Sequence, residues 1–122
     1  MLGKIRQIAV AVKDLEVSKA FYRDKVGLTL LFEAPPSLVF FDLAGIWLML
    51  SQENEKEPAQ PGSVLYFEVA NIGNEYAALK ARGVVFEDEP HRIADMGTYE
   101  LWMTFFRDPD GTLLALRAEV AK

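Results

Sequence analysis

Residues 5–28 read IRQIAVAVKDLEVSKAFYRDKVGL, a strand pattern that turns into a helix pattern. Ile5–Val12 is rich in β-branched and small apolar residues, which is typical of a strand. Asp14 has the side chain of a helix N-cap, and apolar residues then recur at helical spacing over Leu15–Val26. Gly27 suits the position after a helix, because glycine adopts positive φ without a Cβ penalty. The stretch therefore predicts a strand followed by a helix.

Three more strands are expected in the first half of the chain. They lie at Leu28–Ala34, Leu38–Leu43 and Ile46–Ser51. Pro35-Pro36 ends the first of them, because proline cannot donate to a strand ladder. Ala44-Gly45 predicts a tight turn between the other two. Residues 1–51 therefore form a predicted βαβββ module.

The second half of the chain repeats that order. Gln52–Gly62 contains asparagine, glutamates and prolines and is predicted to be an exposed linker to a second module at residues 63–122. Asp108-Pro109-Asp110-Gly111 has the composition of a type I turn. The expected elements are strands at Val64–Val69, Val84–Glu87, Thr98–Phe106 and Thr112–Ala118, a helix at Ile72–Arg82 between Asn71 and Gly83, and an irregular segment at Asp88–Gly97.

The two halves can be laid on each other. A shift of 57 residues (71 − 14) places Asp14 on Asn71, so that both helices begin at a capping side chain. A shift of 66 residues (111 − 45) places Gly45 on Gly111, so that both final turns carry glycine. Matching element order and cap chemistry indicate an internal duplication. The predicted fold is therefore a single α+β domain made of two βαβββ modules.

Composition and charge limit the classes of partner that the protein can be expected to bind. The chain has 122 residues, a formal net charge of −5 and scattered basic residues, which argues against nucleic acid as a partner. No apolar run approaches the roughly 20 residues that span a membrane, and no basic amphipathic helix predicts binding to a membrane surface. There is no cysteine, so disulfides and thiolate metal sites are excluded. A cytoplasmic location is the expectation.

Four motifs carry a resemblance to a known family. They are Val10-Ala11-Val12-Lys13-Asp14-Leu15, Phe21-Tyr22-Arg23-Asp24, Val26-Gly27-Leu28 and Phe106-Arg107-Asp108-Pro109-Asp110-Gly111. In this order, and with the duplication, they resemble the vicinal oxygen chelate superfamily, which includes glyoxalase I, bleomycin-resistance proteins and extradiol dioxygenases. The resemblance implies curved mixed sheets that enclose a cup, and it implies homodimers.

The same resemblance implies where a metal would bind. Enzymes of the superfamily hold one divalent ion with up to four ligands, one from the first and one from the last strand of each module. Those positions here are Gln7, Met49, Val64 and Ala115. Hard divalent ions need oxygen or imidazole ligands, and only Gln7 offers one, because a thioether prefers soft metals and Val64 and Ala115 have no donor. The sequence therefore predicts no metal and no cofactor, which puts glyoxalase and dioxygenase activity in doubt.

Inward-facing side chains predict a pocket for a flat, partly apolar molecule. Alternation along the strands puts Trp47 and Met49 on the cup side, and likewise Tyr66 and Glu68. In the last strand, the same alternation puts Arg117 on the cup side. Arg117 is therefore the candidate partner for the Glu68 carboxylate. Plain core filling and a structural Glu–Arg pair are the alternatives. The expected ligand-binding residues are Gln7, Trp47, Met49, Tyr66, Glu68, Trp102 and Arg117, of which Trp102 has an uncertain phase.

Three functions remain open on this evidence. The first is a metal-free protein that binds a small, partly apolar or aromatic molecule. The second is a lyase, isomerase or epimerase that uses Glu68 or the single histidine, His91, as general base. The third is a displaced metal site built from Gln7, Glu68 and His91, although tight sites usually need three good donors.

Overall fold

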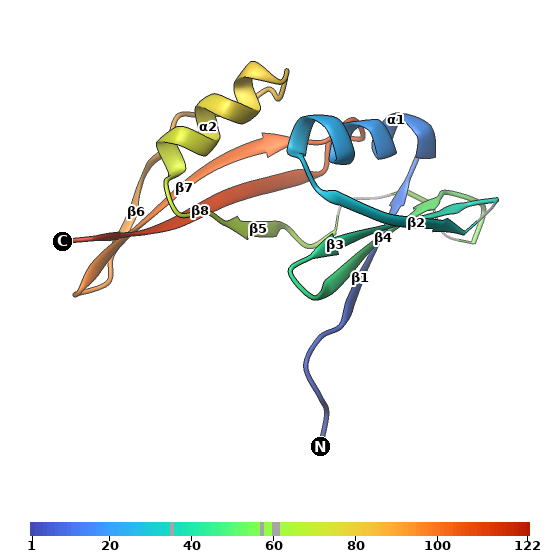
Figure 1. Ribbon diagram of the computed structural model, residues 1–122, viewed down its shortest axis with the longest axis horizontal. Helices are drawn as coiled ribbons and strands as arrows, with labels where there is room; N and C mark the ends of the chain where they lie inside the picture. Colours follow the sequence, from blue (N-terminus) through green and yellow to red (C-terminus); the bar gives the residue numbers. More distant parts are fainter. Residues whose placement is uncertain (35, 57, 60–61) are drawn as a thin grey trace. The chain divides into compact units, whose positions relative to one another are not determined.

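A computed structural model describes residues 1–34, 36–56, 58–59 and 62–122. The chain divides into two compact units, Met1–Gln60 (unit 1) and Pro61–Lys122 (unit 2), and each is considered by itself (Figure 1). Pro35 lies outside the described residues, as do three residues of the expected linker, namely Glu57, Gln60 and Pro61. No helix of the described part is long and apolar enough to cross a membrane.

Unit 1 contains a four-stranded mixed sheet. Its strands are β1 (Gln7–Val12), β2 (Thr29–Ala34), β3 (Leu38–Leu43) and β4 (Ile46–Gln52), in the spatial order β1-β4-β3-β2. β1 pairs with β4 in parallel, and the other neighbours are antiparallel. The turn between β3 and β4 has positive φ at both Ala44 and Gly45, which confirms the expected tight turn.

The helical segment of unit 1 begins as predicted and then changes its winding. Asp14 accepts hydrogen bonds from the backbone N–H groups of Glu16 and Val17, which confirms it as the N-cap of α1 (Leu15–Ala20). The predicted single α-helix is only partly correct, because the chain continues as a π-helix, η1 (Phe21–Val26). Such wide turns accommodate one extra residue per turn within a helical run.

Unit 2 repeats the architecture. Its elements are β5 (Leu65–Glu68), α2 (Ile72–Ala81), β6 (His91–Asp95), β7 (Tyr99–Arg107) and β8 (Leu113–Ala121), with strand order β5-β8-β7-β6. Asn71 caps α2 through its side-chain oxygen, and the N–H of Gly111 bonds to the carbonyl of Asp108 in the expected turn. Figure 1 shows α2 lying over one side of β7 and β8.

One strand of unit 2 was misplaced by the sequence interpretation. A short strand was expected at Val84–Glu87, but only Phe86 forms an isolated bridge there. The strand is instead β6, within the segment Asp88–Gly97 that was expected to be irregular. β6 lies at the edge of the sheet, and an edge strand tolerates the charged residues that hid it from a search for apolar alternation.

The strand register confirms the internal duplication. Ala9 lies opposite Met49 in unit 1, and Tyr66 lies opposite Ala115 in unit 2. These pairs are related by the same shifts of 57 (66 − 9) and 66 (115 − 49) residues that the sequence gives. The corresponding edge strands β2 and β6 also each carry an irregularity, between Leu30 and Phe32 in β2 and after Arg92 in β6.

Each helical segment covers one side of its sheet, and the core lies beneath it. In unit 1, Tyr22 of η1 lies 6.2 Å from Phe41 of β3 between ring centroids, which places Phe41 on the helix side. In unit 2, the ring of Phe86 contacts Phe106 of β7. The buried strand residues on these sides are Val12, Val39, Phe41, Leu48 and Leu50, and Phe106, Leu114, Leu116 and Ala118. The opposite side of each sheet carries no helix, and we call it the open face.

Candidate functional site

The open face of unit 1 collects aromatic side chains. Directly paired residues point to the same side of a sheet. Gln7 lies opposite Trp47, Met49 opposite Phe40, and Phe40 opposite Phe32. The open face of unit 1 therefore includes Gln7, Phe32, Phe40, Trp47 and Met49, with Ala9 and Asp42 beside them.

Three of these rings form one cluster. Phe32 and Phe40 stack with ring centroids 4.5 Å apart and an interplanar angle of 20°. Trp47 meets both edge-on, at 5.4 Å from Phe32 and 5.6 Å from Phe40. Phe40 is buried, but Phe32 and Trp47 keep 43% and 39% of their surface exposed. The cluster thus has a fixed geometry and an accessible outer surface.

Gln7 and Met49, two of the positions at which the resemblance implies metal ligands, contact each other. The Nε2 of Gln7 lies 3.6 Å from the Sδ of Met49, so the amide points one donor at the thioether. The other two positions supply no donor, since Val64 and Ala115 have hydrocarbon side chains. One neutral amide and one thioether do not fit a hard divalent cation, which takes several oxygen or imidazole ligands.

The open face of unit 2 is charged. Glu68 lies opposite Arg117, and the Nη1 of Arg117 donates to the Oε1 of Glu68 at 3.0 Å. The Nη2 of the same guanidinium reaches Glu119 at 3.4 Å. Tyr66 meets Phe105 edge-on, with ring centroids 6.3 Å apart. The Glu–Arg pair expected from the sequence is therefore present, with a second carboxylate beside it.

The two candidate general bases lie on this face but at opposite edges of the sheet. Glu68 of β5, Arg117 of β8, Met103 of β7 and His91 of β6 form one row of directly paired residues. Three strand spacings of about 4.8 Å put the backbones of Glu68 and His91 roughly 14 Å apart. His91 lies near the backbone carbonyl of Glu89, with its Nδ1 2.8 Å from that oxygen. The two groups are too far apart to act on one reacting atom together.

Trp102 lies on the other side of the sheet from Tyr66 and Glu68. It pairs with Ala118 of β8 and Arg92 of β6, all on the side that α2 covers. Its indole N–H donates to Glu100 at 3.2 Å. The structure therefore separates Trp102 from the open-face residues with which the sequence interpretation had grouped it.

The displaced metal site gains no geometric support. Glu68 and His91 stand at opposite edges of one sheet. Within the described ranges, no group of three or more histidine and acidic side chains is placed to hold a metal ion.

Sequence reasoning missed several open-face residues. Phe32, Phe40, Met103 and Phe105 were not singled out, although Phe40 and Phe105 occupy equivalent positions before the last turn of each module. The signal that finds them is strand pairing, because Phe40 faces Met49 and Phe105 faces Ala115. The β2 irregularity hid Phe32, since the extra residue shifts its phase.

Comparisons with known proteins agree with this architecture. The family model described as Glyoxalase/Bleomycin resistance protein/Dioxygenase superfamily matches residues 4–116. The uncharacterized protein YraH of Bacillus subtilis (strain 168) is 29% identical over 126 residues, covering 93% of this chain and 96% of YraH.

Solved structures share the fold. A lactoylglutathione lyase from Agrobacterium tumefaciens aligns with a TM-score of 0.77 at 21% identity, over 96% of this chain and 94% of that one. A glyoxalase/bleomycin resistance protein/dioxygenase from Nocardioides aligns with a TM-score of 0.75 at 26% identity, over 98% of this chain and 85% of that one. The chain belongs to the Glyoxalase/Bleomycin resistance protein/Dioxygenase superfamily.

Proposed function

We propose that the protein binds a small, partly aromatic molecule without a metal ion, and that the ligand stacks on the aromatic cluster of Phe32, Phe40 and Trp47. The single observation that carries this proposal is the half-exposed state of Phe32 and Trp47 on a helix-free sheet face. Contiguous exposed apolar surface of this kind typically marks an interaction site.

The geometry of the cluster favours a flat ligand. Offset-stacked and edge-to-face ring pairs add about 0.5–1.5 kcal/mol each beyond the burial of area. Trp47 and Phe32 already meet at 78°, so a planar ligand lying on one ring presents its edge to the other. Two such contacts together are worth about a fivefold to 150-fold gain in affinity.

Polar groups beside the cluster can orient a bound ligand through hydrogen bonds. The indole N–H of Trp47 has no acceptor among the residues that the structure describes, so it remains available to a ligand oxygen. The carbonyl oxygen of Gln7, which lies opposite Trp47, is an acceptor on the same face. A ligand with both an oxygen and an N–H or O–H group matches this pair.

The donor set supports binding without metal. Gln7 and Met49 are the only two of the four family ligand positions that carry a heteroatom in the side chain, and they contact each other. The ligand is therefore expected to bind equally well with and without a chelator. Affinity that depends on added divalent ions would count against the proposal.

Two variants of unit 1 test the aromatic contact. Phe32→Ala and Trp47→Ala each remove one exposed ring, and each is expected to weaken the binding of a hit from a fragment screen about tenfold. Val85→Ser is the matched control, because Val85 is also an exposed apolar side chain and lies outside the cluster. Equal losses in all three variants would argue for nonspecific adsorption.

The rival function is a lyase, isomerase or epimerase with Glu68 or His91 as general base. The observation in its favour is that both side chains belong to the open face of unit 2. Against it, the Glu68 carboxylate already pairs with Arg117. Glu68→Gln and His91→Ala would abolish any turnover found by substrate screening, if the rival is right.

We also propose that the protein is a homodimer, as its family resemblance implies. Light scattering coupled to size-exclusion chromatography tests this, because the mass of one chain is 13.7 kDa. A single peak at twice that mass is the expected result, and a monomer at high concentration would contradict it.

A further inference from the structure

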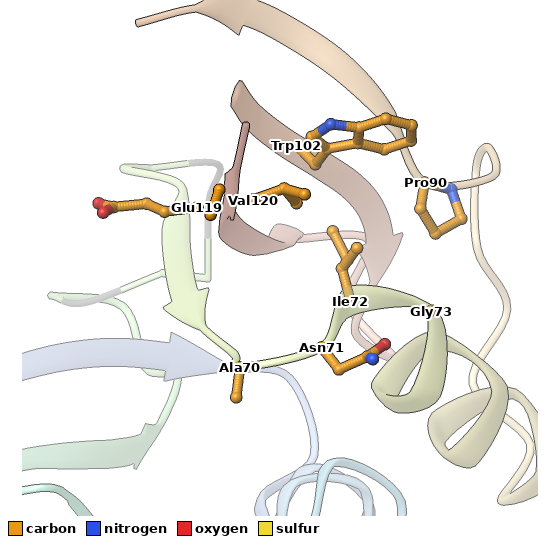
Figure 2. A pocket seen from close by; sticks show the side chains of 9 residues that line it. Ala70, Asn71, Ile72, Gly73, Pro90, Trp102, Glu119 and Val120 are labelled. Atoms are coloured by element: carbon orange, nitrogen blue, oxygen red, sulfur yellow. The ribbon is translucent and has the colours of Figure 1, made fainter. Parts of the chain in front are cut away.

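A hollow lies on the helix side of unit 2, where β8 ends beside the start of α2. It has a volume of about 490 Å³ and is bounded by the start of α2, the end of β8, β7 and the segment before β6. Small-molecule sites usually have volumes of about 300–1,000 Å³. Figure 2 shows its lining side chains. The hollow is therefore large enough for a molecule of two fused rings.

The walls of the hollow are apolar. Trp102, Pro90, Ile72 and Val120 turn their side chains toward the same space, whereas the carboxylate of Glu119 points away from it (Figure 2). The indole N–H of Trp102 is already donated to Glu100. Trp102 therefore offers a ligand its ring surface and not its hydrogen-bond donor.

Gly73 leaves one part of the lining without a side chain. Its backbone does not have the positive φ that favours glycine, and a Cβ built there would meet only the Oδ1 of Asn71, at an ordinary 3.5 Å. Glycine is a poor helix former compared with alanine, and this one lies in the first turn of α2. Neither backbone conformation nor crowding explains this glycine, and a larger residue would narrow the hollow.

One polar side chain, that of Asn71, belongs to the lining of the hollow. Asn71 uses its Oδ1 to cap α2, through the N–H of Asn74 at 3.0 Å. Within the described part of the chain, nothing accepts a hydrogen bond from its side-chain NH₂ group. This group is a donor at the edge of an otherwise apolar space.

We propose that this hollow is a second ligand site, distinct from the aromatic cluster of unit 1, and that it takes a flat, uncharged heteroaromatic molecule with one hydrogen-bond acceptor. The ring lies against Trp102 and Ile72, and its acceptor meets the NH₂ of Asn71. An anionic ligand is disfavoured, because Glu100 is bonded to the indole that forms one wall.

The two tryptophans of the chain make this site testable, since each unit contains one. The probe is 2-quinolinone, a neutral bicyclic lactam with a carbonyl acceptor. It is titrated into ¹⁵N-labelled, tag-free full-length protein while the two indole N–H signals are followed, after assignment with Trp47→Phe and Trp102→Phe. The proposal predicts a saturable shift of the Trp102 signal. No shift of Trp102, or a shift of Trp47 alone, overturns it.

Two leucine substitutions on α2 provide the matched pair. Gly73→Leu fills the hollow and is expected to weaken the Trp102 response at least about tenfold, with the Trp47 signal unchanged. Asn74→Leu adds the same side chain one residue further on, outside the lining, and is expected to leave the response intact. Both variants are first shown to be folded by their amide spectra. An undiminished Trp102 response in Gly73→Leu overturns the proposal.

Discussion

Glu68 and Arg117 lie directly opposite each other on neighbouring parallel strands, with 3.0 Å between the carboxylate Oε1 and the guanidinium Nη1. The Glu68 side chain is 64% exposed and that of Arg117 is 27% exposed. Exposed ion pairs are usually worth less than about 1 kcal/mol, because water screens them. We therefore expect Glu68→Gln to lower the free energy of unfolding by no more than about 1 kcal/mol in urea titrations.

A control variant separates the effect of losing the ion pair from the effect of losing one negative charge. Glu55→Gln removes an exposed carboxylate that lies outside the helices and strands, and it is expected to have a smaller effect still. A loss of about 3 kcal/mol or more in Glu68→Gln would mean that the pair is buried, and would contradict this description of the open face.

Replacing Ser18 by alanine is expected not to destabilise the folded protein. The Ser18 hydroxyl is buried against the sheet of unit 1 and has no hydrogen-bond partner among the described residues. An unpartnered buried polar group costs about 1–3 kcal/mol, and alanine is also the better helix former. Ser18→Ala should leave the free energy of unfolding unchanged or raise it by about 1 kcal/mol. Ser63→Ala, at an exposed position, serves as control, and a loss of stability confined to Ser18→Ala would show that the hydroxyl is bonded.

The lowered pKa of Asp95 predicts how its contribution to stability depends on pH. A hydrogen bond from Lys122, and then one from the backbone N–H of Gly97, lower the pKa of the Asp95 carboxyl below its ordinary 3.8. A lowered pKa means that the folded state favours the ionised form, so this contribution is present above pH about 4 and is lost as the pH falls through the lowered value. Carboxyl ¹³C titration should give a midpoint below 3.8.

The same titration has an internal test. Lys122→Met should move the Asp95 midpoint back toward 3.8, whereas Lys4→Met, which removes the same charge from unit 1, should leave it in place. An unchanged midpoint in Lys122→Met would mean that the Lys122 contact does not form.

The poor ligand set of Gln7 and Met49 predicts that the protein retains little divalent metal. Tag-free protein soaked in Zn²⁺, Ni²⁺, Mn²⁺ or Fe²⁺ and then desalted is expected to retain less than about one ion per ten chains by elemental mass spectrometry. The thermal midpoint should also be insensitive to chelator. About one ion per chain would show that residues other than Gln7 and Met49 supply ligands, and metal-dependent assays would then take priority.

Local chemistry made much of the fold predictable. Asp14 and Asn71 cap their helices as expected, because capping depends on a side chain and its immediate backbone neighbours. The duplication was also readable, since the same residue shifts recur in the strand register. The edge strand β6 was not predicted, because a strand at the edge of a sheet does not need alternating apolar residues.

The candidate site was less predictable, because it depends on pairing between strands. Glu68 and Arg117 were matched correctly from their shared phase. The side on which Trp102 points is set by its register with Ala118, which no local pattern in β7 reveals. Phe32 was missed because an extra residue in β2 shifts its phase.

The most direct test of the proposed function is a fragment screen on chelator-treated protein, read out at the indole N–H of Trp47. We predict that flat aromatic fragments with an oxygen acceptor shift this signal saturably without metal, and that Phe32→Ala weakens the response about tenfold while Val85→Ser does not. A Trp47 signal that no fragment moves, or that moves only after a divalent ion is added, would contradict metal-free ligand binding on the aromatic cluster.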